Sequence, residues 1–164
     1  QVMVSQNFGA RNPQRINAFL QTAAVAVIVI GALCIAVLLT ASEALVLLFL
    51  DDQAGQGGDT LVLALTFVNY VWPLFLFAGV NMLISGYLTA IHRPFQSGVI
   101  AVCRSLVLPA GLLIVFYSFL SDYQFVAALP VAEGLTFVLA TVMYLRHMPM
   151  RALRDEHPRG FDTD

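Results

Sequence analysis

Residues 23–39 read AAVAVIVIGALCIAVLL, and this stretch decides the fold class. It lies inside an uncharged segment of 27 residues, 16–42, and a second uncharged segment of 32 residues covers 60–91. A helix that crosses the hydrocarbon core of a bilayer needs about 20 predominantly apolar residues. Outer-membrane β-strands are only about 10 residues long and alternate in polarity. The two segments therefore predict membrane-spanning α-helices.

The composition of the whole chain agrees with this interpretation. Hydrophobic residues make up 59% of it and charged residues 11%, whereas soluble domains carry about 25% charged residues. The absence of lysine and the net charge of -2 argue against nucleic-acid binding. Cys34 and Cys103 both lie within apolar segments, which argues against a disulfide-rich secreted domain. The sequence predicts an integral membrane protein whose main partner is the lipid bilayer.

Four membrane-spanning helices can be placed, at residues 16–39, 63–90, 95–119 and 125–145. The last is the least apolar because it contains Glu133, which costs about 2.5–3.5 kcal/mol to insert, but its ten Leu, Ile, Phe and Val residues return about 3–6 kcal/mol. We therefore expect an all-α protein with three regions, divided as residues 1–15, a four-helix transmembrane region at 16–145 and a polar tail at 146–164.

The arginines predict the orientation of these helices. Seven of them flank the spans on one side, namely Arg11, Arg15, Arg93, Arg146, Arg151, Arg154 and Arg159. The two connections on the other side, 51–59 and 121–124, contain none. Basic residues concentrate in cytoplasmic segments. We expect a multi-pass protein of the plasma membrane, such as a bacterial inner membrane, with both ends of this chain in the cytoplasm.

Two charged residues, Arg104 and Glu133, interrupt the third and fourth spans. At 1.5 Å of rise per residue they lie about 15 and 18 Å from the cytoplasmic ends of their helices, and sequential antiparallel helices allow the two side chains to meet. Intramembrane charges usually face a bundle interior or a wet cavity. A structural ion pair, a direct role in proton or substrate handling, and separate lipid-facing positions all stay open.

A polar stripe runs along the second span, with Asn81, Ser85 and Thr89 at four-residue spacing. Tyr70 lies eleven residues before Asn81 and is therefore expected on the same helix face. Pro73 should bend this helix. Small and weakly polar residues also serve as packing contacts between membrane helices, so the stripe has two interpretations, packing and the lining of a cavity.

The N-terminal segment reads QVMVSQNFGARNPQR, in which Gly9 suits a helix end and Asn12-Pro13 suits a helix start. It resembles the motif at the cytoplasmic end of the eighth helix of multidrug and toxic compound extrusion (MATE) transporters. The matching residues are Gln1, Asn7, Gly9, Ala10 and Arg15, while Val2 stands where the family commonly has proline. Residues 79–109 are similar to the family's tenth and eleventh helices, and residues 130–144 to its twelfth.

This resemblance implies that the chain corresponds to the end of helix eight and helices nine to twelve of a twelve-helix transporter, within its C-terminal six-helix lobe. Such proteins export organic cations or amphiphilic drugs in exchange for sodium ions or protons, and the tenth helix lines the cavity of this lobe. Tyr70, Asn81 and Ser85 thereby become candidate substrate contacts. Some sodium-coupled members carry an acidic residue near the position of Ala78. This chain has none there, so the coupling-ion site is expected in the other lobe. No further cofactor is implied.

The alternatives differ in what they require of the sequence. A lipid-linked oligosaccharide flippase of the same superfamily would need more basic residues lining its cavity than Arg104 alone. A small four-helix drug exporter would need a glutamate in its first helix, where this chain has only Glu43 at the far end. A non-transporting scaffold subunit also remains open. No nucleophile–base pair and no histidine spacing suited to a metal is present, so neither an enzyme nor a metal site is expected, and four helices alone are not expected to transport.

Overall fold

The computed structural model describes residues 1–49, 58–120 and 122–155, and the regular structure of these residues is entirely helical. The elements are α1 (Val2–Gly9), α2 (Pro13–Thr40), α3 (Ser42–Leu47), α4 (Gly58–Val71), α5 (Leu74–Ala90), α6 (Pro94–Val102), a π-helical turn (Cys103–Val107), α7 (Leu108–Phe119), a 3-10 turn (Asp122–Ala127), α8 (Ala128–Arg146) and α9 (Pro149–Asp155). Residues 51–57 of the predicted connection at 51–59, Arg159 and the last part of the tail lie outside the described residues.

Three of the four predicted spans are continuous helices of membrane-spanning length, and the remaining one is a bent pair of helices. Pro13–Thr40, Pro94–Phe119 and Gln124–Arg146 are each long and apolar enough to cross a bilayer. The predicted second span corresponds to Thr60–Val71 combined with Leu74–Ala90, and the two halves meet at an angle of 49°. Pro73 lies at the break and has no amide hydrogen to donate to the preceding turn. The expected bend at this proline is therefore confirmed.

The start of α2 shows why the first span begins where it does. The Oδ1 atom of Asn12 accepts a hydrogen bond from the backbone N–H of Arg15 at 3.1 Å, and Pro13 occupies the first helical position. The preceding helix, α1, ends at Gly9, and the turn between them places Arg11 at a φ of 52°. Both helix-boundary predictions made from Gly9 and Asn12-Pro13 are thus confirmed.

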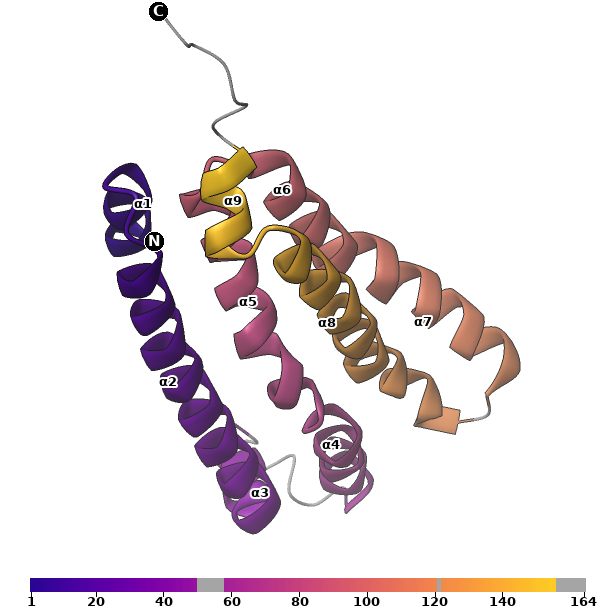
Figure 1. Ribbon diagram of the computed structural model, residues 1–164. Helices are drawn as coiled ribbons and strands as arrows, with labels where there is room; N and C mark the ends of the chain where they lie inside the picture. Colours follow the sequence, from indigo (N-terminus) through magenta and orange to yellow (C-terminus); the bar gives the residue numbers. More distant parts are fainter. Residues whose placement is uncertain (50–57, 121, 156–164) are drawn as a thin grey trace, which may run out of the picture.

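Helix α5 lies at the centre of the bundle. It packs against α2 on one side and α8 on the other, and α7 packs against the far side of α8 (Figure 1). Two glycines bring α2 and α5 close together. A Cβ atom added to Gly31 would lie 3.0 Å from the backbone oxygen of Phe75, and one added to Gly79 would lie 3.1 Å from Cβ of Val27. A larger residue at either position would push the helices apart.

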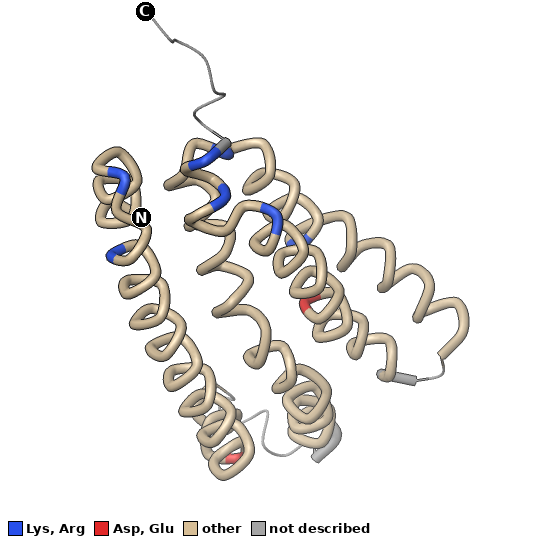
Figure 2. Tube along the Cα trace, viewed as in Figure 1, with Lys and Arg blue, Asp and Glu red and all other residues tan. Residues whose placement is uncertain are grey.

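The buried core is concentrated at the end of the bundle that carries α1 and α9. It is formed by apolar side chains that include Phe8, Ile16, Leu88 and Ile91. Within the polar tail, α9 folds back onto α2 and buries Ala152, which is 2% exposed. The arginines of the described residues gather mainly at this same end (Figure 2). Helix α9 therefore closes one end of the helix bundle.

Large apolar side chains remain exposed along the outer faces of the spans. On α2 they include Val25, Ile28, Val29, Ile30, Leu33 and Val37. A helix that is apolar on its outward face suits a hydrocarbon environment, because lipid tails solvate such side chains as well as a protein core does. The fold is that of an all-α integral membrane protein.

Candidate functional site

The two intramembrane charges form an ion pair in the middle of the bundle. Nε of Arg104 lies 2.6 Å from Oε1 of Glu133, and their side chains are 26% and 9% exposed. The amide nitrogen of Asn81 donates to Oε2 of the same carboxylate at 2.7 Å and to the backbone oxygen of Glu133 at 3.0 Å. The structure therefore brings Asn81 of α5, Arg104 of the π-helical turn and Glu133 of α8 together.

A local irregularity of the third span places Arg104. The backbone N–H of Leu108 donates to the carbonyl oxygen of Cys103, five residues earlier, which is the hydrogen bond of a π-helix. Pro109 follows directly and has no N–H for the carbonyl of Ser105, so a regular α-helical turn would lack a hydrogen bond here. Single π-helical turns are rare and often occur at functional sites. This turn was not predicted, although the proline was its signal.

A cavity of about 250 Å³ adjoins the ion pair, between α5 and the third span. Its lining includes Gln1, Asn81, Ser85, Arg104 and Ser105. The Oδ1 atom of Asn81 is buried and has no hydrogen-bond partner among the described residues. Among the described residues, Arg104 donates its side-chain hydrogen bond through Nε. Asn81 and Arg104 both line this cavity, and the unpartnered Oδ1 atom itself is buried.

Three hydroxyl groups continue from this cavity toward the arginine-rich end of the bundle. The Oγ atoms of Ser85 and Ser97 are 2.8 Å apart, and Thr89 Oγ1 donates to Ser97 Oγ at 2.8 Å. Ser97 Oγ also donates to the backbone oxygen of Ser85 at 2.9 Å. Of the predicted polar stripe, Asn81 and Ser85 therefore both pack between helices and border a cavity. The two interpretations of the stripe, packing between helices and the lining of a cavity, therefore both hold.

Tyr70 does not belong to this group. It lies on α4, on the other side of the 49° break, and lines a separate open cavity of about 700 Å³ with Trp72, Phe77 and Pro130 among its walls. The expectation that Tyr70 shares a face with Asn81 and Ser85 is wrong. It extended the helical repeat across Pro73, where the helix axis changes direction.

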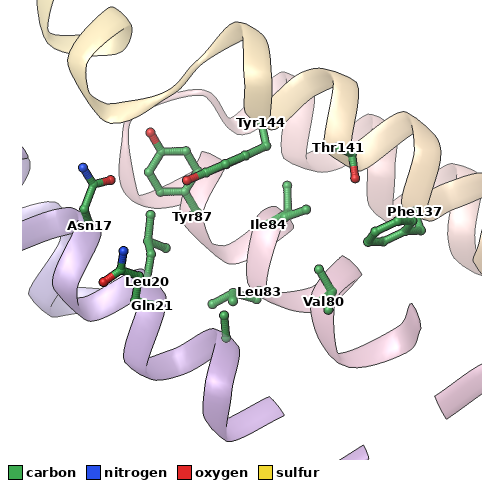
Figure 3. A pocket seen from close by; sticks show the side chains of 11 residues that line it. Asn17, Leu20, Gln21, Val80, Leu83, Ile84, Tyr87, Phe137, Thr141 and Tyr144 are labelled. Atoms are coloured by element: carbon green, nitrogen blue, oxygen red, sulfur yellow. The ribbon is translucent and has the colours of Figure 1, made fainter. Parts of the chain in front are cut away.

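A third cavity, of about 330 Å³, opens between α2, α5 and α8 (Figure 3). Asn17 and Gln21 border it from α2, and Thr141 and Tyr144 border it from α8. The rings of Tyr87 and Tyr144 meet edge to face with centroids 5.4 Å apart. The Tyr87 hydroxyl is already engaged, because it donates to the backbone oxygen of His147 at 2.6 Å. Sequence reasoning missed this cavity, although Asn17 and Gln21 are four residues apart within an apolar helix.

The residues of the N-terminal motif shape the connection between α1 and α2. Asn7 donates to the backbone oxygen of Met3 at 2.7 Å, and the backbone N–H of Ala10 donates to Gln6. Gly9 ends α1, and the backbone N–H of Arg15 donates to the side chain of Asn12, which caps α2. Gln1 borders the cavity beside the ion pair. Among the described residues, no cluster of three His, Cys, Asp or Glu side chains is suited to hold a metal ion.

These features define a multi-pass membrane protein with a polar site buried between its helices. A comparison with protein families identifies it further, because the MatE family profile matches residues 1–115. The match covers more than half of the chain, and the chain therefore belongs to the MatE family of membrane efflux transporters. This result confirms the resemblance to the MATE transporters. Searches of curated proteins and of solved structures found no significant match.

Proposed function

We propose that this chain is part of a cation-coupled antiporter that exports organic cations or amphiphilic drugs across the plasma membrane in exchange for sodium ions or protons. The observation that carries the proposal is the buried Asn81–Arg104–Glu133 cluster beside a cavity. Ionisable groups are costly within a bilayer, and those that occur there commonly mark ion or substrate pathways. Membership of the MatE family supports efflux as the direction of transport.

The proposed orientation places α1 and α9 in or near the cytoplasm. The described arginines concentrate at that end of the bundle (Figure 2), and cytoplasmic segments of membrane proteins are rich in arginine and lysine. The cavity beside the ion pair then lies below the cytoplasmic surface, between α5 and the third span.

The cavities supply candidate contacts for the substrate. Asn81 and Ser85 border the cavity at the ion pair, and Tyr70 borders the open cavity at the bend. Aromatic rings such as those of Tyr70 and Trp72 attract a desolvated cation to their faces. An organic cation with an apolar body fits this combination of aromatic and weakly polar walls.

Transport requires more than the four spans described here. Alternating access in secondary transporters rocks one repeat against another around a site between them. Four spans provide only part of one six-helix lobe. We therefore propose that the chain works within a larger twelve-helix transporter and does not transport alone.

The flippase alternative fits the site less well. A pyrophosphate-linked substrate calls for several unpaired positive charges in the cavity. Arg104 is the basic residue at the ion pair, and Glu133 already neutralises it at 2.6 Å. No contact among the described residues favours the scaffold alternative over transport.

The test measures the efflux of a fluorescent organic cation, such as ethidium, from cells that produce the full-length transporter. Glu133→Gln should lower efflux strongly, because it removes the charge that faces Arg104. Glu43→Gln is the matched control, since Glu43 is exposed on α3 and should leave efflux unchanged. Equal efflux by a correctly inserted Glu133→Gln protein and the unchanged protein would remove Glu133 from the transport mechanism.

A further inference from the structure

The 330 Å³ cavity between α2, α5 and α8 is polar at one end and apolar at the other, and we call it the α2–α8 groove. Asn17 and Tyr144 line it nearest the arginine-rich end of the bundle, which we call its mouth, whereas Ala24 and Phe137 line its deep end on the same two helices. From Asn17 to Ala24 the groove follows α2 for about 10 Å, at 1.5 Å of rise per residue. This length is about a third of the hydrocarbon core of a bilayer.

The polar side chains near the mouth are available to a ligand. Gln21 is exposed and Asn17 is half-buried, and neither amide makes a hydrogen bond to a described residue. The hydroxyl of Tyr144 also has no hydrogen-bond partner among the described residues, although its ring packs against Tyr87. Each amide offers two N–H donors and the phenol offers one O–H donor. A ligand with several acceptor oxygens suits this end of the groove.

Helix α9 adds a positive charge beside the mouth. It follows α8 after a short turn and packs on α2 (Figure 1). Tyr87, which lines the groove, donates to the backbone oxygen of His147 in that turn. Arg151 of α9 donates from Nη1 to the backbone oxygen of Leu145, the residue after Tyr144, at 3.2 Å. This bond holds its guanidinium beside the mouth, and its other nitrogens bond to no described residue.

The charges around the mouth favour an anion over a cation. Arg15 and Arg146 are exposed on α2 and α8 at the same end of the bundle, as is Arg151. The acidic side chains that the structure describes, Glu43 and Glu133, lie on α3 and within the ion pair. Phosphate groups accept strong, charge-assisted hydrogen bonds from arginine, and basic clusters at the ends of membrane helices recognise anionic lipid headgroups. An organic cation would be repelled here.

We infer that the α2–α8 groove binds one anionic phospholipid from the leaflet at the arginine-rich end of the bundle. The lipid phosphate accepts hydrogen bonds from Arg151 and from the amide of Asn17, and one acyl chain extends toward Ala24 and Phe137. This lipid site goes beyond the proposed function, because it depends neither on the exported compound nor on the coupling ion.

Lipid titration of the purified full-length transporter tests the headgroup contact. Native mass spectrometry measures the affinity of the first bound lipid for dioleoyl phosphatidylglycerol and, separately, for dioleoyl phosphatidylcholine. The anionic lipid should bind at least about fivefold more tightly, because a basic residue near a membrane surface contributes about this factor. Arg151→Gln should remove the preference. Arg93→Gln is the matched control and should retain it, since Arg93 precedes α6, which does not line the groove.

A second pair of variants tests the apolar end without changing the charge. Ala24→Phe places a ring in the deep end of the groove and should weaken the binding of phosphatidylglycerol at least about tenfold. Ala18→Phe is its matched control, because Ala18 is exposed on α2 and does not line the groove. Ala24→Leu adds less volume and replaces Ala24→Phe if the larger side chain prevents folding. Glycerol 3-phosphate, which lacks acyl chains, should not displace the lipid.

Several results would overturn the inference. Equal affinities for the two lipids, or a preference that persists in Arg151→Gln, would exclude headgroup recognition at this mouth. Binding that is unchanged by both substitutions of Ala24 would exclude the groove. Displacement of the lipid by glycerol 3-phosphate would indicate a site for free phosphate, and displacement by ethidium would indicate a drug site. The absence of any bound lipid would indicate that another part of the transporter fills the groove. Lipid binding is measured without export, so a failure of the proposed function leaves these results readable.

Discussion

Substituting Glu133 and Arg104 separately and together measures how much the ion pair contributes to the free energy of unfolding, apart from the contributions of the two side chains. Glu133→Gln keeps the shape of the side chain and removes the charge that Arg104 contacts at 2.6 Å. Removing one partner of a fully buried pair costs about 3–5 kcal/mol, because the other charge is left uncompensated. The Arg104 side chain is 26% exposed and keeps part of its hydration. We therefore expect Glu133→Gln to lower the free energy of unfolding by about 2–3 kcal/mol.

Arg104→Met completes the cycle. Alone it leaves the Glu133 carboxylate with a single neutral donor, Asn81, and should also cost about 2–3 kcal/mol. The double variant has no charge at the site, and replacing both members of a buried pair is often nearly neutral. We expect it to lie within about 1 kcal/mol of the unchanged protein, which gives a coupling of several kcal/mol between the two sites.

Unfolding of the full-length transporter in mixed detergent micelles measures all four proteins under the same conditions. Glu43→Gln on the exposed surface of α3 serves as the control and should shift stability by less than about 0.5 kcal/mol. If the costs of the two single substitutions add in the double variant, the two charges act independently. The arrangement of the site as a single polar cluster would then be wrong.

Three further substitutions test other contacts. Gly31→Ala should destabilise the transporter by about 1–3 kcal/mol, because the new methyl group would lie 3.0 Å from a backbone oxygen of α5, whereas Gly98→Ala meets nothing within 4 Å and should be neutral or stabilising in thermal unfolding. Tyr87→Phe removes the 2.6 Å hydrogen bond to the His147 carbonyl, costs about 1 kcal/mol and should speed hydrogen exchange in α9. Pro109→Ala restores an N–H to the third span, so the π-helical turn should revert to an α-helix and efflux of an organic cation should fall; unchanged efflux would contradict this role for the turn.

The features that the sequence predicted well are those that depend on residues close together in the chain. Span length follows from uninterrupted apolar segments, the start of α2 from Asn12 and Pro13, and the bend from Pro73. The meeting of Arg104 with Glu133 also follows from local information, because the two helices are consecutive and antiparallel. In a bilayer, each of these signals is strong, since unpaired backbone groups and charges are costly there.

The features that the sequence did not predict depend on contacts between distant elements. Tyr70 was assigned to the face of Asn81 by counting residues through a break in the helix. The return of α9 onto α2 depends on Ala152 fitting between distant helices, and a single alanine carries no periodic signal. Likewise, the cavity bordered by Asn17 and Tyr144 exists only because α2 and α8 flank α5.

The unsatisfied oxygen of Asn81 distinguishes a structural ion pair from a functional one. If the pair served only to hold α5, α8 and the third span together, an apolar cluster of similar volume would do so at less cost in the bilayer. A structural pair would also be expected to satisfy all of its hydrogen-bonding groups, because a partly satisfied network is less favourable than an apolar one. Here one buried acceptor, Asn81 Oδ1, has no hydrogen-bond partner among the described residues. The missing partner of this oxygen therefore favours a functional role for the ion pair over a purely structural one.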